Sequence, residues 1–170
     1  YRWLCEPGFL YEAGIAPLKN LPVRGMIWYQ GEADTPTLKM VDDYAILFPL
    51  MVDAWREQLE NDDCPFLFVQ LPRYNSDNWP AFREVQRRAQ KSIPHSAMVS
   101  TIDLGLDENI HPKDKQPIGE RLSRLALKYA YGRTNIVGFP VLDGIRREGN
   151  SLIVKFRECG NGFLPVDGEL

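Results

Sequence analysis

PFLFVQL, at residues 65–71, is the stretch that decides the fold of this 170-residue chain. Its apolar side chains fall on both faces of an extended backbone, which is typical of a strand in a parallel sheet covered on both sides. Two other short apolar runs, VRGMIWY at residues 23–29 and AMVSTID at residues 97–103, have the same character. We therefore expect three strands of one sheet.

Segments in which apolar residues recur at helical spacing alternate with these strands. They lie at about residues 41–60, 79–93 and 114–131. We expect Asp42 and Asp43 to open the first helix, where carboxylates suit the helix dipole, and Gly132 to stop the last one. Strands that alternate with helices of this length predict an α/β fold, with a parallel sheet covered by helices on both faces.

The character of the sequence changes after residue 136. Helical periodicity disappears, and SLIVKF at residues 151–156 alternates like a strand behind a Gly149-Asn150 pair that is typical of a hairpin turn. We therefore predict two parts. Residues 1–136 belong to the α/β domain, and residues 137–170 begin a separate β-structured, β-sandwich-like module.

The charge and hydropathy of the chain exclude several classes of protein. The 20 Lys and Arg residues are scattered and the net charge is −3, so the sequence has no basic patch for nucleic acid or for an acidic membrane surface. No apolar run approaches the roughly 20 residues that a membrane span needs. The sequence thus predicts neither a nucleic-acid partner nor a membrane span.

The three cysteines, Cys5, Cys64 and Cys159, are far apart and follow no zinc-binding spacing. We expect buried or half-exposed thiols. A bridge between Cys5 and Cys159 is the alternative in an oxidising compartment, if the fold brings the two residues within reach.

Two polar segments follow predicted strands. Gln30-Gly31-Glu32-Ala33-Asp34 comes directly after the first strand, and residues 107–112, DENIHP, come after the third. Ligands of open parallel α/β sheets bind beyond the carboxyl ends of the strands. We therefore expect the two segments to form one site.

His111 is the candidate acid–base residue of this site, because histidine side chains titrate near neutral pH, with an ordinary pKa of about 6.5. Pro112 favours an extended backbone at His111. Glu108 and Asp107, three and four positions earlier, could hold the imidazole tautomer. The alternative is a solvated histidine in an acidic loop. We expect the other histidine, His95, at the opposite, amino-terminal edge of the sheet, as a surface residue.

Gln30 and Gly31 suit a different role. A side-chain amide can donate a hydrogen bond to a developing oxyanion, and a glycine lets the backbone approach a substrate closely. Glu32 could orient these groups or act as a general acid. The alternative is a strand-to-loop turn whose glycine is needed only by the backbone.

Two strings in these segments resemble a known family. GMIWYQGEAD at residues 25–34 and NIHPKDKQPIGERL at residues 109–122 are similar to two sequence blocks of the SGNH hydrolases, in the form used by sialate O-acetylesterases and related acetylxylan esterases. The segments between them are similar in order and spacing. The resemblance implies a three-layer, flavodoxin-like SGNH fold, of which this chain holds the C-terminal part.

The resemblance also implies a chemistry. The expected enzyme is a serine esterase that removes acetyl groups from carbohydrates, with His111 as general base and Gln30, Gly31, Glu32 and Asp34 on the oxyanion and substrate side. Its triad acid would be Glu108 or Asp107, or a Ser-His dyad would operate. The expected substrate is an O-acetylated sugar, a sialate or acetylated xylan. Neither motif implies a metal or an organic cofactor.

The block of the family that bears the nucleophile is missing. The serines of the chain do not sit in a sharp, Gly-flanked strand-to-helix turn. They are Ser76, Ser92, Ser96, Ser100, Ser123 and Ser151. We therefore expect the nucleophile upstream, on the remainder of the same polypeptide. Relatives of this kind are commonly exported or lysosomal, which suggests an extracytoplasmic location (periplasmic, secreted or lysosomal).

Two rival interpretations stay open. A glycoside hydrolase would use Glu32 with Glu108 or Asp107 as paired carboxylates. A carbohydrate-binding module without a nucleophile would offer aromatic platforms for sugar rings. The candidates for such platforms are Trp28, Tyr29, Tyr74 and Trp79.

Overall fold

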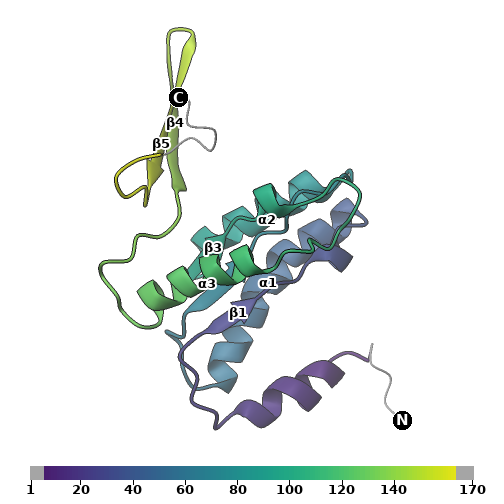
Figure 1. Cartoon of the computed structure of the whole chain (residues 1–170). Coiled ribbons are helices and arrows are strands. Elements are labelled where there is room, and N and C mark those ends of the chain that lie inside the picture. The colour runs from purple at the N-terminus through teal and green to yellow at the C-terminus, as the bar shows by residue number, and fades with distance from the viewer. Residues whose placement is uncertain (1–5, 164–170) are drawn as a thin grey trace.

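Three parallel strands lie at the centre of the structure, a computed structural model that describes residues 6–163 (Figure 1). They are β1 (Met26–Trp28), β2 (Phe66–Val69) and β3 (Ser96–Val99), in the order β1-β2-β3. Met26 pairs with Phe66, and Phe66 pairs with Ser96. The predicted strands and their parallel arrangement are confirmed, although each strand is shorter than the run that predicts it.

Helices cover both faces of this sheet. They are α1 (Leu38–Gln58), α2 (Trp79–Ser92) and α3 (Gln116–Tyr129). The α1 and α2 helices pack against each other and share one core with Phe66 and Phe68 of β2. Leu67 and Val69 point the other way and pack with Leu125 of α3. The side chains of the uniformly apolar strand β2 thus pack into two separate cores, one on each face of the sheet. The α/β prediction is confirmed.

Two predicted boundaries are wrong. The α1 helix begins before Asp42 and Asp43, because the Thr37 hydroxyl oxygen accepts a hydrogen bond from the Met40 backbone N–H at 3.2 Å and caps the helix there. The third strand ends at Val99 instead of Asp103, and the chain continues as the 3₁₀ turn η4 (Ile102–Leu104). The Leu104 backbone N–H closes this turn on the Thr101 carbonyl oxygen at 3.0 Å.

Three further short helices lie outside the predicted elements. They are the π-helix η1 (Tyr11–Ile15) and the 3₁₀ turns η2 (Ala16–Leu18) and η3 (Glu32–Asp34). The Tyr11 hydroxyl donates to the Gln58 side chain at 3.0 Å, and the Gln58 amide donates to the Ala16 carbonyl oxygen at 2.9 Å. These bonds hold η1 and η2 against the end of α1. The third turn, η3, belongs to the candidate site.

A two-stranded antiparallel sheet follows α3 and lies apart from the α/β layers in Figure 1. Its strands are β4 (Val141–Glu148) and β5 (Ser151–Arg157). Gly149 has a φ of 60° in the turn between them, so the predicted strand and turn are confirmed. Glu158 connects this hairpin to α3 by an ion pair with Lys128 and by accepting a 3.1 Å hydrogen bond from the Gly138 N–H. The division of the chain at residue 136 stays a prediction.

The described residues contain two free thiols, the buried Cys64 and the partly exposed Cys159. Cys5, the other member of the alternative bridge, lies outside the described residues. No helix among residues 6–163 is long and apolar enough to cross a membrane.

Candidate active site

The two polar segments follow the carboxyl ends of β1 and β3, as predicted. The first holds Gln30 and the turn η3, and the second leads through η4 to His111. Lys115, beyond His111, reaches back to the segment after β1, where its Nζ lies 3.5 Å from the Tyr29 hydroxyl and 4.7 Å from the centre of the Tyr29 ring. Both segments thus lie at one edge of the sheet. No hydrogen bond within the described part of the chain joins Gln30 directly to His111.

Gln30 is held at two points. Its side-chain Nε2 donates to Asp34 Oδ2 at 2.7 Å, and its carbonyl oxygen accepts a hydrogen bond from Gln86 Nε2 at 3.4 Å. Gln86 is fully buried in α2, so the backbone of Gln30 rests on the core. The amide nitrogen carries two N–H groups and Asp34 takes one of them, which leaves the other for a ligand.

Gly31 occupies a position that accepts no side chain. Its φ is 141°, in the region that L residues rarely adopt, and an added Cβ would lie 2.4 Å from the ring of Phe82. The backbone therefore needs a glycine here, as the alternative interpretation of this turn supposed. The same close approach fixes the loop on α2.

Glu32 and Tyr29 lie close together beside this turn. Burial raises the pKa of Tyr29 to about 12, and the nearby Glu32 carboxylate adds to the shift. The Glu32 carbonyl oxygen accepts a hydrogen bond from the Thr35 hydroxyl at 2.9 Å, which stabilises the turn. The Glu32 carboxylate makes no hydrogen bond or ion pair with another described residue, so it is open to a ligand.

His111 is exposed at the end of its loop, above the buried Pro112. Its backbone N–H donates to the Asn109 side-chain oxygen at 2.9 Å, which fixes the turn that presents the ring. The imidazole of His111 and the carboxylate of Glu108 make no hydrogen bond or ion pair with described residues. The structure does not bring a carboxylate onto the imidazole, and the identity of the acid stays a prediction.

Asp107 is engaged elsewhere. Its Oδ1 lies 2.7 Å from Arg73 Nε, and its carbonyl oxygen accepts a hydrogen bond from the Asn75 N–H at 3.1 Å. Gly105 lies against the backbone of Arg73, where an added Cβ would be 2.2 Å away. The loop that carries His111 is therefore fastened to the segment that follows β2.

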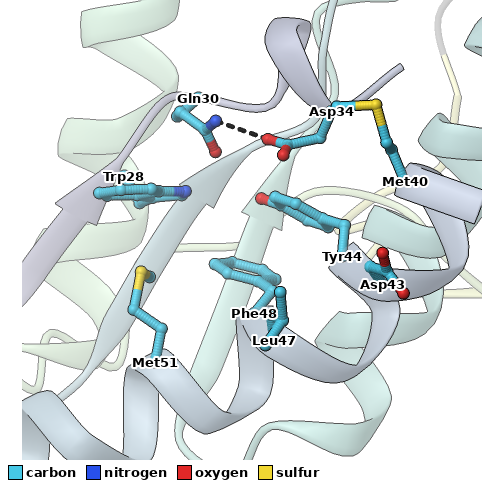
Figure 2. A pocket seen from close by; sticks show the side chains of 9 residues that line it. All are labelled: Trp28, Gln30, Asp34, Met40, Asp43, Tyr44, Leu47, Phe48 and Met51. Carbon is cyan, nitrogen blue, oxygen red and sulfur yellow. Dashed lines mark hydrogen bonds between the residues drawn. The ribbon is translucent and has the colours of Figure 1, made fainter. Parts of the chain in front are cut away.

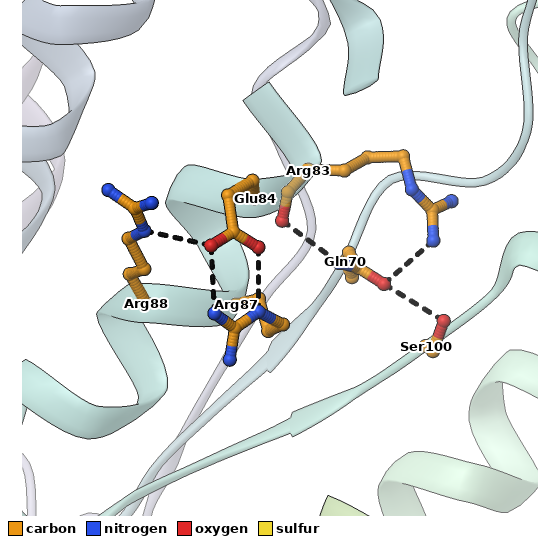
Figure 3. Close-up of polar contacts among 6 residues, drawn as sticks. All are labelled: Gln70, Arg83, Glu84, Arg87, Arg88 and Ser100. Atoms are coloured by element: carbon orange, nitrogen blue, oxygen red, sulfur yellow. Dashed lines mark hydrogen bonds and ion pairs between the residues drawn. The ribbon is translucent and has the colours of Figure 1, made fainter. Parts of the chain in front are cut away.

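A polar network lies behind this loop, at the carboxyl ends of β2 and β3 (Figure 3). Gln70 Oε1 accepts hydrogen bonds from Arg83 Nη2 and from the Ser100 hydroxyl, each at 2.9 Å, and Gln70 Nε2 donates to the Arg83 carbonyl oxygen at 2.9 Å. Burial lowers the pKa of Arg83. Sequence reasoning missed these residues, although a glutamine inside the apolar run of β2 was a signal.

Arg121, on α3, contacts the same region from the other face of the sheet. It donates to the Ser100 carbonyl oxygen at 2.7 Å and to both carboxylate oxygens of Asp103, at 2.7 and 2.5 Å. This bidentate contact lowers the pKa of Asp103. The segment between β3 and the His111 loop is thereby fixed to α3.

A cavity of about 450 Å³ opens between β1 and α1 beside Gln30 and Asp34 (Figure 2). Its walls are mostly apolar. The lining residues are Trp28, Gln30, Asp34, Met40, Asp43, Tyr44, Leu47, Phe48 and Met51. Two buried polar atoms, Trp28 Nε1 and Tyr44 Oη, face one another in this cavity, beyond the distance of an ordinary hydrogen bond. Sequence reasoning did not predict this cavity, because it depends on how α1 crosses β1.

The aromatic platforms of the binding-module interpretation are largely part of the core. Trp79 is 2% exposed and its Nε1 donates to the Pro72 carbonyl oxygen at 2.6 Å. Tyr74 lies with its ring centre 5.0 Å from that of Trp79, and the Trp28 ring packs on Trp55 at 5.4 Å. Trp79 therefore stabilises the fold, whereas the half-buried Trp28 also lines the cavity beside Gln30.

The remaining candidates are the other histidine and the serines. His95 lies at the amino-terminal end of β3 with Nε2 3.1 Å from Asp63 Oδ1, and more than half of its side chain is exposed, as predicted. The hydroxyl groups of Ser92, Ser96 and Ser123 donate to carbonyl oxygens close to them in the sequence. No serine in the described ranges contacts His111. Within residues 6–163, no group of three or more His, Cys, Asp or Glu side chains could hold a metal ion.

A doubly covered parallel sheet defines the chain as an α/β domain, and its two polar loops lie beyond the strand ends, where ligands of such sheets bind. The family can be named more closely. The chain belongs to the carbohydrate esterases described as sialic acid-specific acetylesterase, whose family model matches residues 2–128. The resemblance predicted from the two strings is therefore confirmed.

Individual relatives agree with this family. Sialate O-acetylesterase from Rattus norvegicus is 34% identical over 149 residues, which cover 75% of this chain and 27% of that protein. The Homo sapiens sialate O-acetylesterase is 30% identical over 148 residues, with 75% and 28% covered. The crystal structure of a carbohydrate acetylesterase from Xanthomonas citri matches with a TM-score of 0.75 at 32% identity, covering 83% of this chain and 34% of that one. The chain thus spans just over a quarter of the curated relatives that it matches.

Proposed function

We propose that this chain contributes the general base and an oxyanion donor to a carbohydrate O-acetylesterase that hydrolyses acetyl esters on sugars. The observation that carries the proposal is the fixed amide of Gln30, which keeps one N–H free in the loop to which Lys115 ties the His111 segment. An amide aimed at a developing oxyanion is worth about 10²–10³ in kcat. The family relationship supports the same reaction class.

The reaction would proceed in two steps. A serine hydroxyl attacks the acetyl carbonyl while His111 takes its proton, and the tetrahedral oxyanion receives the free N–H of Gln30. His111 then gives the proton to the departing sugar oxygen. In the second step His111 takes a proton from water as the water attacks the acetyl-enzyme, and then returns this proton to the serine oxygen, so that acetate is released and the serine is restored. The serine is proposed to lie on the remainder of the same polypeptide, because no described serine contacts His111.

The carboxylate partner of His111 is proposed to be Glu108. Asp107 forms an ion pair with Arg73, so it serves to anchor the loop and is less available to the imidazole. Glu108 is exposed next to it and free of described contacts. A Ser-His dyad without a carboxylate is the alternative.

The proposed substrate is an O-acetylated sugar such as a 9-O-acetyl sialate, with acetylated xylan as the second candidate. The names of the rat and human relatives favour the sialate. Because sialates and plant polysaccharides occur outside the cytoplasm, we also propose an extracytoplasmic location. Release of acetate from each substrate by the whole polypeptide, measured side by side, tests the choice.

The serine mechanism has its own test. A fluorophosphonate probe should label one serine of the whole polypeptide covalently, and prior incubation with an acetylated substrate should slow the labelling. A glycoside hydrolase with paired carboxylates would stay unlabelled, and that result would reject the proposed mechanism. The burial of Trp79 removes one of the aromatic platforms that a binding module would use.

A further inference from the structure

We propose that Lys115 and Tyr29 form a subsite for a carboxylate of the sugar substrate, which gives the esterase a preference for acidic sugars. This Lys115–Tyr29 subsite consists of the Lys115 ammonium group and the Tyr29 hydroxyl, 3.5 Å apart. The inference rests on the proposed function, because it assigns the part of that site which would distinguish a sialate from a neutral acetylated sugar.

The two residues of the subsite come from the two polar segments of the candidate active site. Tyr29 directly precedes Gln30, and Lys115 follows His111 by four residues. The Lys115 side chain lies over the Tyr29 ring, with Nζ 4.7 Å from the ring centre. A ligand held by these two groups would therefore lie at the edge of the sheet to which Gln30 and His111 belong.

The charge of Lys115 is not neutralised within residues 6–163, because its ammonium group forms no ion pair with a carboxylate there. Asp114, its neighbour in the chain, instead accepts a hydrogen bond from the Gln116 backbone N–H at 3.0 Å. An ammonium group has three N–H donors, and the contact with Tyr29 uses one of them. Two donors and a full positive charge are thus open to a ligand.

The arginines that contact the segment between β3 and Lys115 are already neutralised. Arg73 pairs with Asp107 at 2.7 Å, and Arg121 pairs with Asp103 at 2.5 Å. Each arginine would have to give up its aspartate to bind a substrate carboxylate. Lys115 can bind one without breaking an ion pair, and for this reason the subsite is assigned to it.

The Tyr29 hydroxyl supplies a second donor. Its oxygen accepts the contact from Lys115, and it donates to no acceptor in the described part of the chain. Burial, with a further contribution from the Glu32 carboxylate, raises the pKa of Tyr29 to about 12, so the phenol keeps its hydrogen at neutral pH. The two oxygens of a carboxylate can accept from an ammonium group and from a hydroxyl at the same time.

The Glu32 carboxylate restricts how a ligand can bind. It lies close enough to Tyr29 to affect its pKa, so it would repel a carboxylate placed beside it. We expect the ligand carboxylate on the Lys115 side of the Tyr29 hydroxyl, with Glu32 left to accept a hydroxyl group of the sugar. A sialate carries both groups, whereas an acetylated xylose unit carries hydroxyl groups and no carboxylate. The subsite therefore favours the sialate.

Two sugars that differ only in charge test the inference. Release of acetate from 9-O-acetyl-N-acetylneuraminic acid and from the neutral carboxamide of the same sugar would be measured with the whole polypeptide. We expect kcat/KM to be about 10-fold higher for the acid, because hydrogen bonds between charged groups contribute about this much. The difference should lie in KM, since the carboxylate takes no part in the chemical step.

Variants then locate the preference. Lys115→Met should lower kcat/KM for the acid about 10-fold more than for the carboxamide, and Tyr29→Phe should change the same ratio by a smaller factor. Lys115→Arg should keep most of the preference, because the charge remains. Lys113→Met removes an exposed lysine two residues earlier and should leave the ratio unchanged.

Equal kcat/KM for the two sugars in the natural polypeptide would overturn the inference and leave the proposed esterase in place. Equal losses for both sugars in Lys115→Met would do the same, since they would mean that Lys115 only holds the two loops together. A natural polypeptide that hydrolyses no acetyl ester would reject the proposed function instead.

Calorimetric titration with N-acetylneuraminic acid keeps the inference testable in that case. Binding that is about 10-fold weaker to Lys115→Met than to Lys113→Met would support the subsite. Equal binding to these two variants, or no binding to the natural polypeptide, would overturn it.

Discussion

The amide of Gln30 donates a hydrogen bond of 2.7 Å to the carboxylate of Asp34, four residues later. The bond closes the polar loop after β1 and holds the Gln30 amide in one orientation. An amide that must stabilise an oxyanion gains most when its orientation is set before the reaction. In the proposed mechanism, Asp34 would therefore act on the reaction through Gln30.

Replacement of Asp34 by alanine should lower kcat for an aryl acetate by less than replacement of Gln30 itself, for which about 10²–10³-fold is typical of a lost oxyanion donor. The amide would still be present but would sample other orientations. Steady-state kinetics of the whole polypeptide measures both. Asp43→Ala is the matched control, since Asp43 lines the same cavity and pairs with Lys39. An Asp34→Ala enzyme with unchanged kcat would show that the orientation of the amide is set by other contacts.

Replacement of Gly31 by alanine should destabilise the fold by about 2–4 kcal/mol, because it combines a strained φ with a clash against the Phe82 ring. Urea unfolding of the 170-residue chain measures this difference. Gly119→Ala serves as the control, because nothing lies within 4 Å of an added Cβ at this helical position. That control should be neutral or stabilise by up to about 1 kcal/mol. Equal stabilities of the two variants would contradict the described loop.

Replacing Arg73 and replacing Asp107 should change kcat in the same way. Their ion pair is exposed, so its removal should cost less than about 1 kcal/mol of stability. If the pair serves to hold the His111 loop, Arg73→Ala and Asp107→Ala should lower kcat by similar factors, and the double variant should be no worse than either. Glu108→Gln should lower kcat further than both. A much larger loss for Asp107→Ala than for Arg73→Ala would instead identify Asp107 as the triad acid.

Glu84 should make stability depend on pH. Hydrogen bonds from Arg87, with a further one from Arg88, lower the pKa of Glu84 to about 2 (Figure 3). A carboxyl whose pKa is lower in the folded state stabilises the protein above its unfolded pKa of about 4.3, and this contribution disappears as the pH falls toward 2. The contribution is small because the group is partly exposed.

The measurement is the difference in unfolding free energy between the natural chain and Glu84→Gln, followed from pH 7 downward. The difference should favour the natural chain at pH 7 and shrink below about pH 4. Glu57→Gln, at a position without a described ion pair, should give no such trend. A difference that stays constant down to pH 2.5 would contradict the described contacts.

The sequence predicts the order and layering of the helices and strands better than the residues at which they begin and end. Runs such as that of β2 are apolar on both faces, so they specify a doubly covered sheet whatever the details of their neighbours. Helix ends depend on single hydrogen bonds, and the Thr37 cap shifted the start of α1 away from Asp42 and Asp43. The β4 strand escaped prediction because VLDGIRRE carries charges and a glycine where a strand pattern would be apolar.

For the candidate site too, the sequence predicts the location better than the contacts. The carboxyl ends of parallel strands meet at one edge of a sheet, so the sequence alone predicts that the two polar loops lie at the same edge. The contacts that shape the loops join residues far apart in the chain. Phe82 lies against Gly31, and Arg73 holds Asp107, and neither pair has a local signal. The cavity between β1 and α1 is of the same kind, since it depends on packing alone.

The most direct test of the central proposal compares the two histidines. His111→Ala and His95→Ala would be made in the whole polypeptide, and kcat for hydrolysis of an aryl acetate would be measured for each. We expect His111→Ala to lose activity by about 10³-fold or more, as general bases of serine hydrolases do, and His95→Ala to keep the natural kcat. A His111→Ala enzyme with full activity would contradict the proposed role of His111 and, with it, the proposed esterase site.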